Sequence, residues 1–351
     1  MKLNLQKNFF SETKKELISY GTFKINAFRY SSGVEALEVE NSRCSFIFTP
    51  FKGQQIWHFK VDGEEVSMKT TVKEPTDSTV YLKNYGGFLY HCGVTSFGAP
   101  DSEHPHHGEI PNEIYRSAYI SCGEDSKGRY ILLGGELYHD TAFVRKYKFS
   151  PEIKLYENST VFKITVNLEN QRAYPMEYMY LCHINFRPID GAKLIYSAPA
   201  TPENIKVYRA TGTKELDDYM DALEKNPSLM DEVGHKGEIY DPEICFGIKY
   251  KGDENGRAYT LQDTKDGACY VSHPVDILSN GVRWISRTNN EDSMGMVLPA
   301  TAEHIGYENA KATGQLKIID ADSSVKFTME AGYISPEEAD KVKAKISDIL
   351  K

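Results

Sequence analysis

Hydrophobic and polar residues alternate along most of the chain, in short runs rich in aromatic and β-branched side chains. This period of two predicts strands that each bury one face. Turn-forming pairs separate the runs: Asp62-Gly63, Gly86-Gly87, Asp190-Gly191, Asn255-Gly256, Asp266-Gly267 and Asn280-Gly281. We predict strands at 22–30, 34–39, 44–49, 55–61, 130–137, 142–149, 154–156, 161–168, 177–185, 244–250, 258–262, 268–273, 294–298, 314–319 and 325–333. About fifteen short strands at this spacing favour a sandwich or a barrel.

Two segments instead follow a helical period. Ser335-Pro336-Glu337-Glu338 is a capping box with proline at the first helical position, and it predicts a C-terminal helix. The second helix is predicted at 214–225, inside a polar stretch at 201–238 that we interpret as a surface insertion or lid. No repeat or linker divides the rest. We therefore expect one all-β domain over residues 1–351, a large antiparallel β-sandwich with few helices.

The composition narrows the possible partners. The chain has 351 residues, of which 40% are hydrophobic and 26% charged, as in an ordinary globular protein. Its 41 basic and 50 acidic side chains give a net charge of -9, so we expect no nucleic-acid partner. The 23 Tyr and 16 Phe are more informative, because aromatic residues favour strands and also line sugar sites.

The cysteines and the termini indicate a compartment. Six widely spaced cysteines without a C-x-x-C pair predict buried thiols in a reducing environment, not a disulfide framework or a zinc knuckle. The first residues contain no apolar segment typical of a secretory signal. No apolar run approaches the roughly 18 residues of a membrane span. We therefore expect a cytoplasmic protein without a membrane partner.

No motif for a nucleotide cofactor is present. The chain lacks G-x-G-x-x-G, the P-loop pattern and the G-x-S-x-G elbow of serine hydrolases. We therefore expect no cofactor. What remains is a β protein with histidines, carboxylates and many aromatic rings.

The densest polar cluster is a loop rich in proline and glycine at 98–112, which holds three of the ten histidines. If the chain were extended there, His107 and Glu109 would share one face. His104 and His106 have a spacing that permits metal binding, although solvated loop histidines are the simpler interpretation, and we expect no metal.

Two further segments carry candidate binding residues. In the predicted strand around 179–186, His183 and Asn185 share a face, and imidazole transfers protons near neutral pH. In the turn at 50–58, Lys52, Gln54 and Trp57 combine polar groups with an aromatic ring, a combination that suits sugars. Trp284 is either core or the wall of a site.

Taken together, several strings resemble the galactose mutarotase-like (aldose 1-epimerase) superfamily, and most closely a branch often described only as a domain of unknown function. They are FRYSSGVEALEVENSR at 28–43, PFKGQQIW at 50–57, NYGGFLYHCGVTSFGAP at 84–100, HHGEIPN at 106–112, MEYMYLCHINF at 176–186 and VLPAT at 297–301. They span most of the chain in family order. The resemblance implies a large antiparallel β-sandwich with a sugar cleft on one sheet.

The resemblance also implies acid–base chemistry on a cyclic aldose. His183 matches the general acid that protonates the ring oxygen, and His107 matches the histidine that touches the sugar. The family's base is a glutamate before a proline, and here that position is Leu298, which cannot accept a proton. Glu303 and Glu109 are the replacement candidates, and Asp263 is a weaker third.

Three functions remain open after this reading: an aldose 1-epimerase-like enzyme, a sugar-binding protein without catalysis, and a metal-dependent sugar isomerase that uses His104, His106, His107 and Glu109. The sugar is not identified. An acidic or phosphorylated sugar would be bound by the cations Arg116, Lys52 and Arg283. Arg116 and His106 are further candidate binding residues. The sequence leaves a homodimer open.

Overall fold

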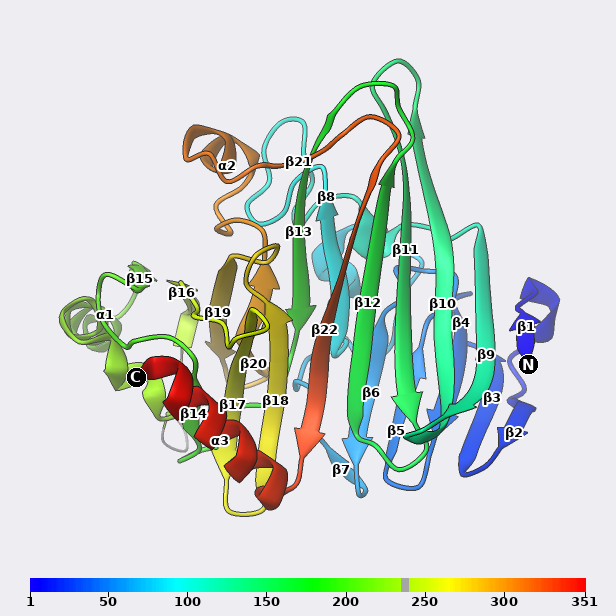
Figure 1. The fold of residues 1–351 in the computed structure, drawn as a ribbon, viewed down its shortest axis with the longest axis horizontal. Coiled ribbons are helices and arrows are strands. Elements are labelled where there is room, and N and C mark those ends of the chain that lie inside the picture. The colour runs from blue at the N-terminus through cyan, green and yellow to red at the C-terminus, as the bar shows by residue number, and fades with distance from the viewer. Residues whose placement is uncertain (235–239) are drawn as a thin grey trace.

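The computed structural model describes residues 1–234 and 240–351, and within them the strands form two antiparallel sheets (Figure 1). The smaller sheet has the order β1 (Lys2–Asn4), β9 (Ser117–Asp125), β10 (Gly128–Thr141), β11 (Arg145–Tyr156), β12 (Val161–Asn170), β22 (Ser324–Ile334), β18 (Gly267–Pro274), β17 (Arg257–Thr264) and β14 (Lys193–Tyr196).

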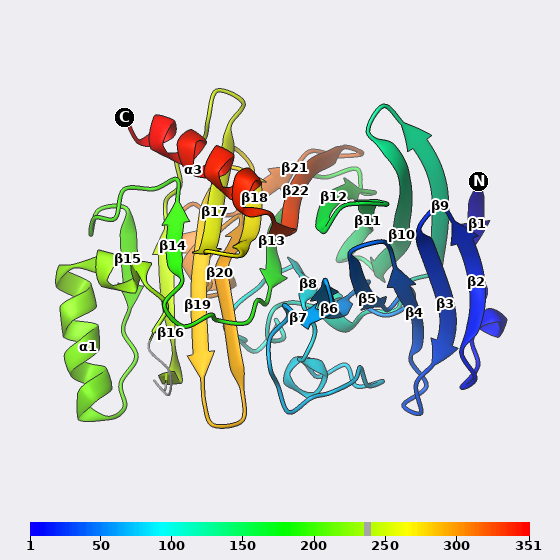
Figure 2. The same ribbon diagram turned by 90° about the horizontal axis from the view of Figure 1, so that it is seen from below.

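The larger sheet carries the site described below. Its order is β15 (Ile205–Tyr208), β16 (Tyr240–Ile248), β19 (Asn280–Arg287), β20 (Asp292–Ala300), β13 (Met176–Ile184), β8 (Leu89–Val94), β6 (Ile56–Val61), β5 (Cys44–Phe48), β4 (Glu35–Glu40), β3 (Phe23–Arg29) and β2 (Lys15–Tyr20). Two short strands pair beside it, β21 (Lys317–Ile319) with β13 and β7 (Glu64–Glu65) with β6. Figure 2 shows α1 (Lys214–Lys225) and β15 at one end of the molecule and β1 and β2 at the other.

The main core lies between the two sheets. Phe162 of β12 contacts Phe46 of β5 and Phe59 of β6, with ring centroids 5.0 and 4.8 Å apart. On β13 the alternation divides the side chains as the sequence predicts. Cys182 and Ile184 enter this core, whereas residue 181 belongs to a separate apolar cluster beneath the site. The sandwich is therefore stabilised mainly by apolar burial between the sheets.

Helix α3 (Pro336–Leu350) covers the outer face of the smaller sheet. It crosses β14, β17 and β18 (Figure 1), and its Ala339 and Ile346 pack into a cluster with Tyr259 and Leu261. The Ser335 side chain accepts a hydrogen bond from the backbone N–H of Glu338, which confirms the predicted capping box. The helix therefore covers the part of this face that β14, β17 and β18 form.

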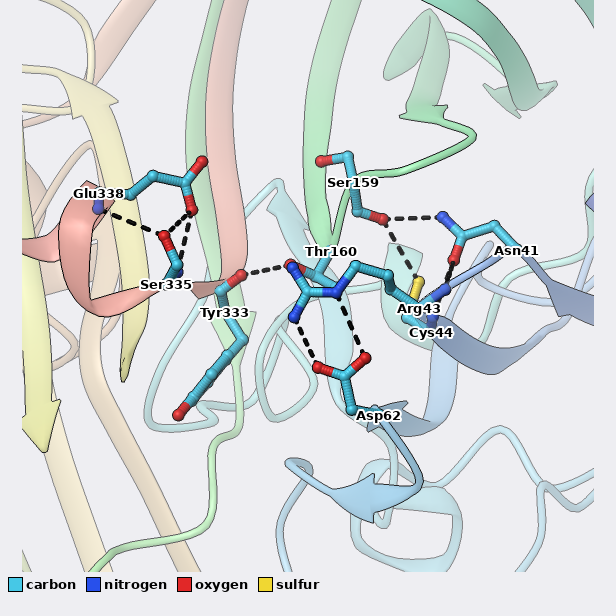
Figure 3. Close-up of polar contacts among 9 residues, drawn as sticks. All are labelled: Asn41, Arg43, Cys44, Asp62, Ser159, Thr160, Tyr333, Ser335 and Glu338. Carbon is cyan, nitrogen blue, oxygen red and sulfur yellow. Dashed lines mark hydrogen bonds and ion pairs between the residues drawn. The ribbon is translucent and has the colours of Figure 1, made fainter. Parts of the chain in front are cut away.

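Polar contacts join turns from both sheets at one end of the sandwich (Figure 3). The Asn41 amide donates to the Ser159 carbonyl at 2.7 Å, and Arg43 pairs with Asp62 at 2.5 Å. The Thr160 hydroxyl donates to the Tyr333 carbonyl, at the end of β22 and just before α3. These contacts fix the β4–β5, β6–β7 and β11–β12 turns relative to the start of α3.

The predicted fold class is confirmed, and so are both predicted helices, α1 and α3. The prediction of a turn at Asn280-Gly281 is wrong, because these residues open β19 and pair with Ala300 and Pro299 of β20. Several strands escaped prediction: β1, β2, β7, β8, β9, β14, β15 and β19. So did the short helix α2 (Tyr307–Ala312) and the 3₁₀ turns η1 (Lys7–Phe9), η2 (Tyr81–Asn84), η3 (Ile110–Asn112) and η4 (Pro227–Asp231).

The stretch at 201–238 is joined to the sandwich as far as the structure describes it. Its β15 extends the larger sheet beside β16, and Leu216, Met220 and Leu223 of α1 are buried in the main core. Residues 235–238 of the stretch lie outside the described residues. All six cysteines are buried thiols, as predicted. In residues 1–234 and 240–351, no helix has the length and apolar character needed to cross a membrane.

Candidate functional site

A cavity of about 360 Å³ opens on the outer face of the larger sheet, and we call it the cleft. Its floor comes from four consecutive strands of that sheet, β16, β19, β20 and β13, and loops close its sides. The lining residues are Tyr81, Leu82, Tyr85, Gly98, Ala99, Pro100, His106, His107, Leu181, His183, Glu243, Cys245, Val282, Trp284, Leu298, His304 and Ile305. The volume suits a small molecule, since such pockets span roughly 300–1,000 Å³.

His107 and His183 meet in this cleft. Their ring centroids are 5.2 Å apart and their planes stand at 83°. His106 stacks on His107 at 4.5 Å, and Tyr81 of η2 packs against both rings. Imidazoles that are 76 positions apart in the sequence, at 107 and 183, therefore face the same cavity.

The loop that carries His106 and His107 is held by backbone contacts. The His107 amide donates to the Gly98 carbonyl, and the Gly93 amide of β8 donates to the His107 carbonyl, both at 3.1 Å. His107 has a φ of +61°, so the segment is a turn and strand alternation does not apply. For this reason His107 faces the cleft while Glu109 points elsewhere.

His183 is held in one tautomer by Asn185. The Asn185 Nδ2 donates to the Gly87 carbonyl at 3.0 Å, so its Oδ1 faces His183 Nδ1 at 2.7 Å and also accepts from the Tyr85 hydroxyl at 3.0 Å. An amide oxygen only accepts, and Nδ1 therefore carries the proton. The other ring nitrogen, Nε2, is left with its lone pair available to a ligand.

Burial keeps these imidazoles neutral. Desolvation lowers the pKa of His183 to about 3, against the smaller opposing effect of the Asn185 hydrogen bond. Burial and the neighbouring histidines hold the pKa of His107 well below its usual range. At neutral pH the neutral His183 can therefore accept a proton at Nε2, whereas the family resemblance implied a proton donor.

Buried histidines make the fold sensitive to acid. Burial lowers the pKa of His91, His183 and His273 to about 3 and that of His304 to about 4, whereas an unfolded imidazole titrates near 6.5. Between these values the unfolded chain binds more protons, so stability falls as the pH falls from about 6.5 towards 3. Each histidine contributes a slope of up to about 1.4 kcal/mol per pH unit.

Thermal unfolding followed from pH 7 to pH 4 checks this expectation. We expect Tm to fall steadily. His273→Met should reduce the slope, because it removes one buried histidine whose pKa is lowered. The substitution breaks no hydrogen bond, since neither ring nitrogen of His273 has a partner. A Tm that stays constant between pH 7 and pH 5 would contradict the expectation.

Glu243 is a cleft residue that the sequence analysis missed. Its carboxylate accepts a hydrogen bond from Trp284 Nε1 at 2.6 Å, and the Trp284 ring packs edge-on against His183 at 5.5 Å. A register shift between Tyr240 and Ile244 of β16 surrounds this position, and bulges re-aim side chains. Tyr81, Tyr85 and His304 were also missed, although Tyr85 lies in a string that carried the family resemblance.

The carboxylates expected as base lie outside the cleft lining. Glu109 accepts hydrogen bonds from the Thr95 backbone N–H and hydroxyl and from the Tyr147 hydroxyl of the smaller sheet. Glu303 pairs with Lys206 at 2.9 Å, and this contact lowers its pKa against the effect of burial. Asp263, on β17 of the other sheet, pairs with Lys343 at 3.1 Å. Their placement does not support the role of base.

Four candidate binding residues also lie elsewhere. Lys52 is buried and donates to the Ser78 carbonyl at 2.9 Å, and Gln54 is buried and donates to the Pro50 carbonyl at 2.9 Å. Trp57 is fully buried in the apolar cluster beneath the cleft. Arg116 is exposed and pairs with Asp140 at 2.7 Å. The turn at 50–58 therefore supports the cleft and does not line it.

Leu298 does line the cleft, together with Leu181 and Val282. The position at which the resemblance places a glutamate is thus an apolar corner. His104, a candidate metal ligand, pairs with Asp101 and packs against the Tyr307 ring at 4.8 Å. Within the part of the chain that the structure describes, no three His, Cys, Asp or Glu side chains gather closely enough to hold a metal ion.

Over residues 31–332 the sequence matches a family described as a domain of unknown function (DUF4432). No curated protein matches the chain significantly. A structure from Klebsiella pneumoniae described as a "putative aldose 1-epimerase" has a TM-score of 0.81 and 16% identity, and covers 100% of this chain and 92% of its own.

A galactose mutarotase-like protein from Clostridium acetobutylicum has a TM-score of 0.56 and 14% identity, and the match covers 92% of this chain and 98% of that one. At such identities the likeness establishes the fold, which is galactose mutarotase-like. What the cleft binds has to be argued from its own residues.

Proposed function

The chain belongs to the DUF4432 family, and we propose that its cleft binds a cyclic monosaccharide and interconverts the two anomers by acid–base ring opening. The observation that carries this proposal is the convergence of His107 and His183 in one cavity of sugar size. Structures of similar fold that are named after mutarotases support it.

The walls of the cleft suit a sugar. Tyr81, Tyr85 and Trp284 supply aromatic surface for the C–H face of a pyranose, while the histidines and Glu243 supply polar groups for its hydroxyls. His183 Nε2 can accept a hydrogen bond from a sugar hydroxyl. His107 Nδ1 is buried without a partner, so the tautomer with the proton on Nε2 is favoured, and its N–H is free to donate to a sugar oxygen.

Ring opening needs modest chemistry. A proton leaves the anomeric hydroxyl, another reaches the ring oxygen, and each positioned acid or base contributes roughly 10² to 10⁴-fold. No nucleotide takes part in this chemistry. Leu298 cannot accept a proton, so the base has to be another residue of the cleft.

The test is anomer exchange measured by NMR over a panel of aldoses. We expect at least one neutral aldose to exchange faster with the protein than in buffer, and we expect His183→Ala and His107→Ala each to abolish most of that excess. Exchange at the buffer rate for every sugar would refute the catalytic proposal.

A second candidate is a sugar-binding protein without catalysis, and Leu298 is the observation that favours it. Sugar-dependent stabilisation in a thermal shift assay separates the two, because a ligand that binds only the folded state raises Tm. A raised Tm without anomer exchange would establish binding alone.

The cleft favours uncharged sugars. None of its described lining residues is Lys or Arg, and its carboxylate is negative, so an anionic ligand meets repulsion. Arg283, the third cation considered for such a ligand, donates to the Met296 carbonyl away from the cleft lining. We expect the 6-phosphate or the uronate of a bound aldose to bind at least about tenfold more weakly, or about 1.4 kcal/mol. Titration calorimetry checks this, and equal affinities would contradict it.

A further inference from the structure

Five side chains make a circuit around the cleft. His106 stacks on His107, His107 meets the edge of His183, and His183 packs against Trp284, which donates to Glu243. The charge of Glu243 in turn acts on His106. Glu243 is the one carboxylate among the described lining residues of the cleft.

The three imidazoles differ in how readily they take a proton. His183 is 3% exposed and His107 has a buried Nδ1, so desolvation dominates both. His106 is partly exposed at the mouth of the cleft. Burial lowers its pKa, but Glu243 raises it in part. Of the three imidazoles, His106 therefore takes a proton most readily, and the charge of Glu243 favours that proton.

We propose that Glu243 and His106 are the base and the acid of the ring opening, and that they act in place of the carboxylate absent at Leu298. This inference rests on the function proposed above and assigns its two proton-transfer groups. The carboxylate comes from β16 instead of β20, two strands away in the same sheet.

The step balances with these two groups alone. The Glu243 carboxylate takes the proton of the anomeric hydroxyl, and the C1–O1 bond becomes a carbonyl. The bond between C1 and the ring oxygen breaks, and the ring oxygen takes a proton from the imidazolium of His106. After rotation about C1–C2, the same transfers in reverse close the ring from the other face of C1 and restore both groups.

The charges favour this pair over His183 as the base. When a proton passes from His106 to Glu243 through the sugar, the imidazolium and the carboxylate both become neutral. The open-chain state therefore leaves no charged group in this pair. Transfer to His183 would instead move the positive charge from His106 to a buried position, where desolvation lowers the pKa of the imidazole. His183 is left to hold a sugar hydroxyl with its Nε2 lone pair.

Kinetics of three variants test the assignment. Gln at 243 still accepts from Trp284 but takes no proton, so we expect Glu243→Gln to lower kcat by roughly 10² to 10⁴-fold with KM changed only a few-fold. His106→Gln should behave alike. Asp241→Asn is the matched control, because Asp241 is an exposed carboxylate on the same strand outside the cleft lining, and its kcat should stay within twofold.

The pH profile gives a second readout. The groups that face His106 are Tyr81 of η2, His107 of its own loop, His183 of β13 and Glu243 of β16. The active form carries a protonated His106, so kcat/KM should fall about tenfold per pH unit above the pKa of His106, which lies below 6.5. Glu243→Gln should lower kcat/KM over the whole profile, because the variant has no base at any pH.

NMR titration of the histidine side chains tests the pairing without any turnover. We expect the pKa of His106 to fall in Glu243→Gln and to stay unchanged in Asp241→Asn. If the wild-type protein exchanges no sugar, the proposed function fails, and the pairing still stands or falls by this titration. An unchanged His106 pKa in Glu243→Gln, or a Glu243→Gln variant with wild-type kcat, overturns the inference.

Discussion

Replacing Asn185 with leucine should cost about 3 kcal/mol of folding stability and remove most of the activity. Asn185 is fully buried, and its amide joins His183, Tyr85 and the Gly87 carbonyl. Leucine has a similar volume but removes the donor to the Gly87 carbonyl, and it leaves His183 Nδ1 only the Tyr85 hydroxyl, 3.4 Å away. The imidazole is then free to change tautomer, which places a donor where the cleft needs an acceptor.

Asn170→Leu is the control for this variant. Asn170 is equally buried and donates to three backbone carbonyls, but it lies on β12 of the other sheet. Urea denaturation should show similar losses of stability for both variants. Anomer exchange by the folded protein should fall at least about 100-fold in Asn185→Leu alone. Equal activity in the two variants would show that Asn185 only supports the fold.

Replacing Gly98 with alanine should disrupt the loop that carries His106 and His107. Gly98 has a φ of +87°, and a Cβ there would lie 1.8 Å from the His304 carbonyl oxygen. The Gly98 carbonyl also accepts a hydrogen bond from the His107 backbone N–H. Strain at such a position costs of order 1–3 kcal/mol, and the clash adds to it, so we expect a loss of about 3 kcal/mol or more.

Gly33→Ala separates the backbone strain at positive φ from the steric clash of the new Cβ. Gly33 has a φ of +91°, but a Cβ there would meet nothing within 4 Å. Chemical denaturation should therefore show a smaller loss for Gly33→Ala than for Gly98→Ala. Sugar binding should weaken in Gly98→Ala only. If Gly98→Ala binds sugar as tightly as the wild type, sugar binding does not depend on the position of the loop that carries His106 and His107.

The parts of the site that could be predicted depend on local backbone geometry. His183 and Asn185 share a face because alternation in a strand requires only the strand itself, and that prediction is confirmed by the contact between them. The separation of His107 from Glu109 escaped prediction because the chain turns there, with a φ of +61° at His107. The sequence at that point shows glycine and proline but not which turn they form.

Other parts depend on strand order, which the sequence does not display. Glu243 reaches the cleft because β16 pairs with β19, and no motif surrounds it. Lys52, Gln54 and Trp57 looked like an exposed polar turn, but all three are buried. Gln55 in the same turn donates to the Pro111 carbonyl and to Asn112 Oδ1, which ties the turn to the loop that follows His107. Burial of polar groups in this way follows from tertiary contacts that no local pattern encodes.

The most direct measurement is the position of a bound sugar in crystals grown with a neutral aldose that stabilises the protein. The account predicts electron density for one pyranose in the cleft, with an oxygen within hydrogen-bond distance of His183 Nε2, a ring face on the aromatic wall and the C1 hydroxyl beside Glu243. Sugar bound on another surface, with the cleft empty at saturation, would contradict it.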